Sequence, residues 1–203
     1  QQPFIEAFVD APEYIDAVRV AALTGSRPEE LRKGVEVEIT LRQSLIIRIH
    51  GAKVTDTTGQ ELRILEIGIT NPIARDLAVS VHDNGRDGQM LVNIDNPRKF
   101  CDRLRTISRR VFPEIKYIVT PYSLRHSVSA DLKAQGLPVE TRARFLGHQS
   151  GRSQRAYGRA RQCKYPLISV RKVSATEMVR HTETATWPGK PKQASAVVRS
   201  HAP

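Results

Sequence analysis

The chain has 203 residues, which suits one domain with or without a tail. Its 32 lysines and arginines outnumber its 21 aspartates and glutamates, and the net charge of +11 favours a polyanionic partner, most commonly nucleic acid. Two cysteines cannot supply a cysteine zinc site or a disulfide framework, and no apolar run reaches membrane-spanning length. We therefore expect free thiols in a reducing, cytoplasmic compartment; the alternative to nucleic-acid binding is a basic protein without that role.

The beginning of the chain is predicted to form two helices. Apolar residues recur at helical spacing over residues 9–23, and a Thr-Gly-Ser sequence at 24–26 ends this pattern. Pro28 is at a favourable first position for a second, short helix that ends near Gly34. Because the chain begins with Gln1 and not with Met, we also expect a further segment upstream.

The middle of the chain is predicted to form strands. Apolar and polar residues alternate over residues 35–39 and 45–49, and an apolar stretch follows at 62–67. Residues 55–59 read Thr-Asp-Thr-Thr-Gly, a composition typical of a turn. We therefore expect a small antiparallel sheet with a hairpin turn near residues 56–59.

Most of the remaining chain is predicted to be helical, apart from a Gly- and Asp-rich loop at residues 83–89. The predicted helices cover residues 71–82, 97–111, 123–135, 138–146 and 153–164. Beyond residue 166 the periodicity fades. We therefore expect one domain over residues 1–165 and a basic, flexible tail over residues 166–203, with a short helix near 176–181.

The helix predicted over residues 97–111 is strongly basic. Asp102 is its only acidic residue, against Arg98, Lys99, Arg103, Arg105, Arg109 and Arg110. We interpret this helix as a phosphate-contacting surface, which gives affinity but no sequence choice; a solvated charged face is the alternative.

Three short strings contain the candidate chemical groups. The first is LTGSRPEEL at residues 23–31, the second is TPYSLRH at 120–126, and the third is LGH at 146–148 with a tyrosine nine residues later. In this order and spacing they resemble the catalytic motifs of the tyrosine recombinase (phage integrase) family. Each string alone is short enough to occur by chance, so the resemblance depends on their combination, which covers residues 9–164.

The resemblance implies a catalytic role for each residue that matches a family motif. Arg27 matches the catalytic arginine of the family's first string, and Arg125 matches that of the second. The third string gives His148, and the tyrosine at the family's usual interval gives Tyr157 as the nucleophile. The family also has a catalytic lysine on a hairpin between the first two strings. Lys53, just before the predicted turn, is the best match, and Lys33 is the alternative.

The second string departs from the family pattern. The family usually has a histidine three residues before the arginine, where this chain has Tyr122. A phenol can donate a hydrogen bond to phosphate but is a poor base near neutral pH. We therefore expect either cleavage at a reduced rate or substitution by His126, which as the neighbour of Arg125 would point about 100° away from it on a helix. Apart from that alternative, we interpret His126 as structural or solvated, like His50, His82 and His181.

The chemistry explains why these residue types are needed. Cleavage of a phosphodiester concentrates negative charge on its nonbridging oxygens, which the guanidiniums of Arg27 and Arg125 can clamp. The phenol of Tyr157 attacks only if its surroundings favour the phenolate, and residues 141–176 contain no Asp or Glu. Lys53 is the candidate general acid for the leaving oxygen, and His148 would orient the phosphate. Such a reaction needs no cofactor and no metal ion.

The resemblance also implies a fold and partners. The expected fold is α+β, mostly helical, with one small antiparallel sheet at its side. The implied function is site-specific recombination of double-stranded DNA through a 3′-phosphotyrosine intermediate, for integration or excision of a mobile element. The implied partners are two DNA sites held by a homo-tetramer, with an upstream DNA-binding domain outside this chain, in a bacterial cytoplasm and away from membranes.

Three alternatives remain. The first is a catalytically impaired DNA-binding relative, in which Tyr122 marks a lost activity. The second is an unrelated helical nucleic-acid-binding module, for which the strings would be scattered in space. The third is a topoisomerase that relaxes DNA without partner choice.

Overall fold

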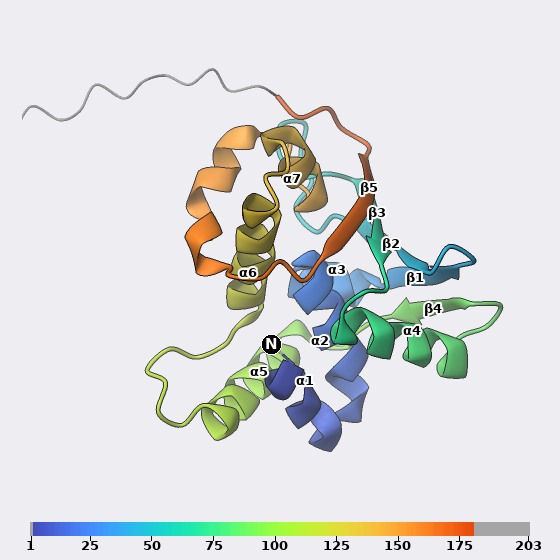
Figure 1. Cartoon of the computed structure of the whole chain (residues 1–203), viewed down its shortest axis with the longest axis vertical. Coiled ribbons are helices and arrows are strands. Elements are labelled where there is room, and N and C mark those ends of the chain that lie inside the picture. The colour runs from blue at the N-terminus through green and yellow to red at the C-terminus, as the bar shows by residue number, and fades with distance from the viewer. Residues whose placement is uncertain (1, 181–203) are drawn as a thin grey trace, which may run out of the picture.

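The computed structural model describes residues 2–180, which form an α+β domain (Figure 1). The α-helices within this range are α1 (Gln2–Glu6), α2 (Pro12–Thr24), α3 (Pro28–Lys33), α4 (Pro72–Asn84), α5 (Pro97–Val111), α6 (Pro121–Ala134) and α7 (Val139–Phe145). The strands are β1 (Val35–Thr40), β2 (Ser44–His50), β3 (Leu62–Gly68), β4 (Gln89–Val92) and β5 (Ser169–Ala175), and the 3-10 helices are η1 (Ala7–Asp10), η2 (Gly151–Ala156) and η3 (Ala160–Gln162). This confirms the expected fold class.

Proline marks the starts of five of the described helices. It occupies the beginning of α2, α3, α4, α5 and α6. At that position its missing N–H costs nothing and its fixed φ suits the helix. In α4, α5 and α6 the preceding side chain accepts a hydrogen bond from the first turn, through Asn71, Asn96 and Thr120. Local chemistry therefore fixes where these helices begin.

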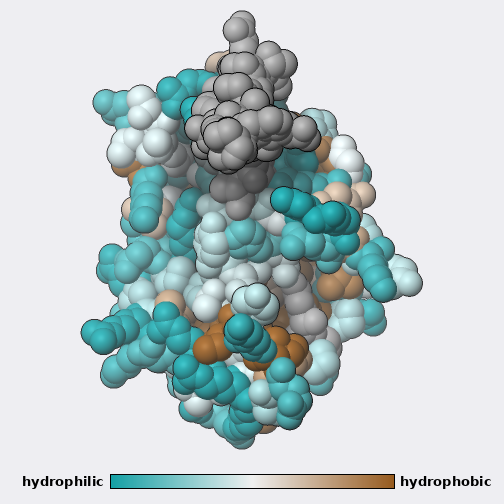
Figure 2. Space-filling view, turned by 90° about the vertical axis from the view of Figure 1, so that its left-hand side faces the viewer, coloured by the Kyte–Doolittle hydropathy of each residue, from teal (hydrophilic) through white to brown (hydrophobic). Residues whose placement is uncertain are grey.

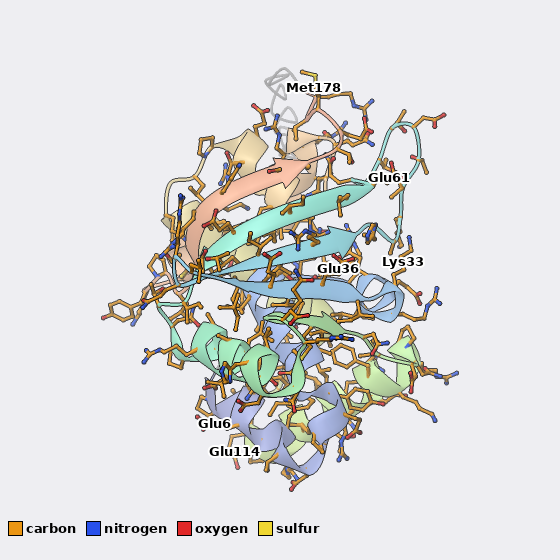
Figure 3. All side chains as sticks on the ribbon, turned by 90° about the vertical axis from the view of Figure 1, so that its right-hand side faces the viewer. Glu6, Lys33, Glu36, Glu61, Glu114 and Met178 are labelled. Atoms are coloured by element: carbon orange, nitrogen blue, oxygen red, sulfur yellow. The ribbon has the colours of Figure 1, made fainter. Side chains whose placement is uncertain are left out.

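The five strands form one antiparallel sheet in the order β4-β1-β2-β3-β5. Most of the alternating apolar side chains of the three central strands β1, β2 and β3 are buried, as at Val35, Ile47 and Leu65. Figure 3 shows the other face of the sheet, where Glu36 lies at the surface. In Figure 1 the helices α6 and α7 lie on one side of the sheet, and α2 packs against both α4 and α6. The core therefore lies between the inner face of the sheet and the helices.

The face on the left of Figure 1 is mostly hydrophilic. Figure 2 shows this face, with one small apolar group in its lower half. The loop between α5 and α6 lies on this side in Figure 1 and exposes Ile115 and Tyr117.

Two strands were missed by the sequence pattern. Strand β4 begins at the last residue of the predicted loop at 83–89, is only four residues long and pairs with β1. Strand β5 lies within the predicted tail and pairs with β3. Val170 and Val173 are three residues apart in the sequence, so β5 lacks the strict alternation that identifies a strand. A register shift between Glu66 and Ile67 accommodates this spacing and pairs the two valines with Ile67 and Leu65. The helix expected near 176–181 is absent from residues 176–180, which contain bends and a single bridge of Arg180 to Ser150.

The prediction of a continuous helix over residues 153–164 was wrong. The segment contains η2 and η3, with Tyr157 in an extended conformation between them at φ −105° and ψ 161°. Hydrogen bonds to side chains of α6, described below, replace the backbone ladder that a continuous helix would need.

Candidate active site

The first string forms the turn between α2 and α3. Gly25 ends α2 with φ 67°, a left-handed conformation that favours glycine. Arg27 then precedes α3, and its backbone N–H donates to the carboxylate of Glu30 at 2.9 Å. The Arg27 guanidinium donates to the same carboxylate at 2.7 Å and stays about a quarter exposed, at 24%. The helix start therefore holds this side chain at the edge of the site.

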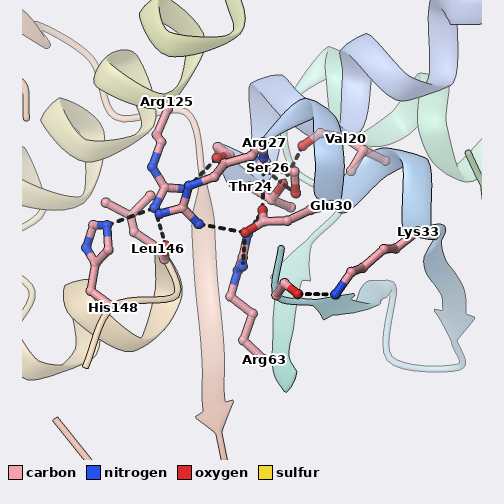
Figure 4. Close-up of polar contacts among 12 residues, drawn as sticks. Val20, Thr24, Ser26, Arg27, Glu30, Lys33, Arg63, Arg125, Leu146 and His148 are labelled. Atoms are coloured by element: carbon pink, nitrogen blue, oxygen red, sulfur yellow. Dashed lines mark hydrogen bonds and ion pairs between the residues drawn. The ribbon is translucent and has the colours of Figure 1, made fainter. Parts of the chain in front are cut away.

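Arg125 connects all three strings (Figure 4). It lies on α6, and its guanidinium donates to the carbonyl oxygen of Gly25 at 2.7 Å and to the carbonyl oxygen of Leu146. It also lies 3.0 Å from Nε2 of His148. Burial, with the Arg27 and Arg63 charges, lowers the pKa of Arg125 to about 10, so the side chain stays charged at neutral pH. Residues of three distant segments thus converge on one buried cation.

A buried ion network supports Arg27. Glu30 and Arg63 are fully buried, and the Arg63 guanidinium donates to both oxygens of the Glu30 carboxylate, at 3.1 and 2.8 Å. Burial would raise the pKa of Glu30, but the Arg63 and Arg27 charges outweigh it and lower the pKa to about 2. Glu30 therefore bridges Arg27, at the surface of the site, to Arg63 on β3.

Neither Glu30 nor Arg63 was predicted as a site residue from the sequence. Glu30 lies within the first string, three residues after Arg27, so its position at the start of a helix was an available signal. Nothing in the sequence marks Arg63, because its strand reads as an ordinary apolar stretch.

His148 follows α7 through a glycine turn. Gly147 has φ 69°, and a Cβ atom there would lie 2.6 Å from an Arg63 nitrogen, so the glycine permits a close approach. Burial, with the charges of Arg125, Arg27 and Arg63, lowers the pKa of His148 to about 3. The ring is therefore neutral near pH 7, and its Nε2 accepts a hydrogen bond from Arg125.

This lowered pKa predicts a loss of stability in mild acid. A group whose pKa is depressed by folding stabilises the fold above its unfolded pKa and loses that contribution as pH falls. For His148 the window runs from about pH 6.5 down to about pH 3. We expect the free energy of unfolding to fall by about 2–3 kcal/mol between pH 6.5 and 4.5, measured by urea titration.

The matched variant for this measurement is His148→Gln, in which the free energy of unfolding should depend much less on pH between 6.5 and 4.5. His126, whose pKa burial also lowers, contributes a remainder of the same sign. An unchanged pH dependence in His148→Gln would contradict the assignment of the effect to this ring.

Tyr157 lies in a cluster of rings. Its ring centroid is 5.3 Å from that of His148, 5.3 Å from that of His126 and 5.7 Å from that of Tyr122. The central carbon of the Arg125 guanidinium lies 5.3 Å from the centre of the Tyr157 ring. The candidate nucleophile is therefore next to the candidate clamp, and Tyr122, whose side chain is exposed, lies beside it.

Lys53 lies in the loop between β2 and β3 and is exposed. It lines a cleft of about 180 Å³ together with Arg27, His148 and residues 57–59 of the same loop. Lys33, the alternative candidate, instead donates to the carbonyl oxygen of Gly51 at the foot of the loop. The geometry therefore favours Lys53 as the lysine that faces the site.

The loop of Lys53 is fastened by the end of the described chain. Gln60 is buried, and its amide donates to the carbonyl oxygen of His148 at 3.1 Å and accepts from the Glu177 N–H at 2.7 Å. Gln149 donates to the carbonyl oxygen of Thr55. Figure 1 shows this loop close to α7. These bonds link the lysine loop to the turn that carries His148.

Some of the basic side chains of α5 make contacts within the domain. Arg103 donates to the Asp10 carbonyl oxygen at 2.6 Å, while Arg110 bonds the Asp10 carboxylate at 2.6 Å and the Ala7 carbonyl oxygen at 2.8 Å. Two of its six basic residues thus hold η1. Arg105 in turn pairs with Asp102 at 2.8 Å. The interpretation of α5 as a phosphate-contacting surface stays a prediction that rests mainly on Arg98, Lys99 and Arg109.

Within residues 2–180 no group of three or more His, Cys, Asp or Glu side chains could hold a metal ion. No helix in that part of the chain is long and apolar enough to cross a membrane.

The fold of this domain is similar to folds of solved structures. The helices around one sheet, with the three strings meeting at Arg125, give this chain the fold of a tyrosine recombinase catalytic domain. The structure is similar to that of XerA recombinase, with a TM-score of 0.56 and 23% sequence identity over 77% of this chain and 56% of that chain. The chain thus spans little more than half of that protein.

Two structures of the Tn1549 transposon integrase in complex with a circular intermediate DNA also align with this chain. Their TM-scores are 0.47 and 0.48, at 14% and 13% identity, over 77% of this chain and 58% of theirs. No protein-family model and no curated protein matches the sequence.

Proposed function

We propose that this domain is a site-specific DNA recombinase or integrase that cleaves and rejoins DNA through a 3′-phosphotyrosine intermediate. The observation that carries the proposal is the convergence on Arg125. Its guanidinium contacts Gly25 of the first string and His148 of the third, and the Tyr157 ring lies 5.3 Å away. Four separate parts of the sequence thus meet at one cation, which supports a phosphate site there.

The proposed cleavage is a transesterification. The Tyr157 oxygen attacks phosphorus, the bond from phosphorus to the 5′ oxygen breaks, and the phenol proton passes to water. Arg27 and Arg125 stabilise the charge on the nonbridging oxygens. Lys53, on the rim of the cleft that Arg27 and His148 also line, gives its proton to the leaving 5′ oxygen. Because the phosphotyrosine keeps the bond energy, rejoining is the reverse reaction and needs no cofactor.

His148 acts through Arg125 in this scheme. As a neutral ring with Nε2 toward the guanidinium, it orients the cation. Its exposed fraction is only 7%, so it forms part of the wall of the cleft and acts on a bound phosphate through Arg125. Tyr122 occupies the position where the family that this chain resembles has a histidine. It serves as a hydrogen-bond donor to phosphate and not as a base.

The partners follow from the same proposal. The net charge of +11 suits double-stranded DNA. As part of the same proposal, a separate DNA-binding domain upstream would assist in binding the duplex. We further propose a homo-tetramer on two DNA sites and a role in integration or excision of a mobile element.

The test is trapping of the covalent intermediate. The chain is incubated, in the presence of EDTA, with a pool of duplexes of random sequence that carry a bridging 5′-phosphorothiolate, whose thiol leaving group rejoins poorly. We expect a complex that resists denaturation, with the DNA attached to the peptide containing Tyr157 by mass spectrometry. DNA binding without any adduct would favour the impaired DNA-binding relative instead.

A further inference from the structure

The backbone around Tyr157 is held against α6 by two side chains of that helix. The Lys133 Nζ atom donates to the carbonyl oxygen of Tyr157 at 2.8 Å and to that of Gly158 at 2.6 Å. The Gly158 N–H donates to Nδ1 of His126 at 3.0 Å. One helix therefore satisfies three backbone groups of a segment that lies outside any regular ladder.

The spacing along α6 makes these contacts available together. Ala130 and Lys133 follow His126 by four and seven residues, so the three lie along one stripe of the helix. A Cβ atom on Gly158 would lie 2.4 Å from the His126 carbonyl oxygen and 3.1 Å from the Ala130 Cβ atom. The segment thus approaches α6 so closely that a side chain at position 158 would collide with its backbone.

The same helix carries the candidate phosphate clamp. Arg125 precedes His126 in sequence, and its guanidinium lies 5.3 Å from the Tyr157 ring centre. Nδ1 of His126 faces a backbone N–H, so it is unprotonated in this arrangement. Helix α6 therefore fixes both the cation and the backbone from which the phenol extends.

We propose that Lys133 and His126 are positioning residues, which keep the Tyr157 segment docked on its own domain. Held in this way, the phenol reaches a phosphate bound by Arg27 and Arg125 of the same chain. The catalytic consequence rests on the proposed function, whereas the docking itself does not. Neither residue touches the reacting atoms, so the effect acts through the backbone at 157 and 158.

The test combines hydrogen exchange of the protein alone with single-turnover adduct formation on the phosphorothiolate pool. In Lys133→Met we expect the Gly158 amide and its neighbours to exchange at least about tenfold faster. Adduct formation should slow by about 10- to 100-fold, because a small misplacement of a nucleophile has effects of that size. Lys133→Arg, which keeps a charged donor, should recover most of both.

Lys172→Met is the matched control, because it removes the same charge from an exposed position on β5. We expect it to leave both measurements unchanged. If Lys133→Met behaves like this control, or forms the adduct faster than the parent, the positioning role is overturned. If the parent forms no adduct while Lys133→Met still exchanges faster, the docking stands and the proposed function fails.

Discussion

The Tyr157→Phe variant is expected to form no covalent adduct with DNA while keeping the stability of the parent within about 0.5 kcal/mol. Phenylalanine retains the ring that stacks on His148 at 5.3 Å and lies by the Arg125 guanidinium, so packing is preserved. It lacks only the oxygen that attacks phosphorus. The measurement is adduct yield on the phosphorothiolate pool, with a urea titration of the same preparation.

Tyr122→Phe is the matched control, since its ring belongs to the same cluster at 5.7 Å from that of Tyr157. We expect this variant to form the adduct at a rate lowered by about tenfold or less, because it loses one donor to phosphate. Tyr122→His, which restores the residue of the resembling family, should raise the rate. An adduct that persists in Tyr157→Phe would contradict the assignment of the nucleophile.

The Glu30→Gln variant is expected to lose about 3–5 kcal/mol of stability, because Arg63 would then keep a fully buried charge without a carboxylate. Glu29→Gln is the control in the same helical turn. Glu29 pairs with Arg32 at the surface, both about half exposed at 52%, and its loss should cost less than about 1 kcal/mol. Denaturant titration of both variants at pH 7 measures the difference.

The pH dependence gives a second readout for Glu30. Its pKa of about 2 in the fold lies below the ordinary 4.5, so its carboxylate stabilises the fold above pH 4.5 and loses this effect as pH falls toward 2. That acid limb should be missing in Glu30→Gln. A double variant, Glu30→Leu with Arg63→Met, should recover stability but not adduct formation, since Arg27 would still lack its partner. Equal stability of Glu30→Gln and Glu29→Gln would contradict the buried network.

Local signals in the sequence predicted the fold well where they were strong. Proline at the helix starts and alternation in β1 and β2 gave elements close to those observed, and α5 spans residues 97–111 as expected. Strand β5 could not be found in this way. Its apolar residues do not alternate strictly, and only its pairing with β3, more than a hundred residues earlier, identifies it.

The candidate site was predicted to the extent that its residues lie in the three strings. The structure brings Arg27, Arg125, His148 and Tyr157 together. It favours Lys53 over Lys33 as the site lysine, because Lys33 donates to a backbone carbonyl oxygen and Lys53 lines the cleft. The shape of the Tyr157 segment was not predictable. Residues 153–164 have helical composition, but hydrogen bonds to Lys133 and His126, distant in sequence, determine the extended backbone.

Strand β5 has a practical consequence for any shortened form of this protein. It covers one edge of β3, whose backbone N–H and C=O groups would otherwise face water or another molecule. Ending the chain at residue 165, where the periodicity first fades, would uncover that edge. A polypeptide cut there should self-associate through strand addition, whereas one that continues past residue 180 should stay dispersed.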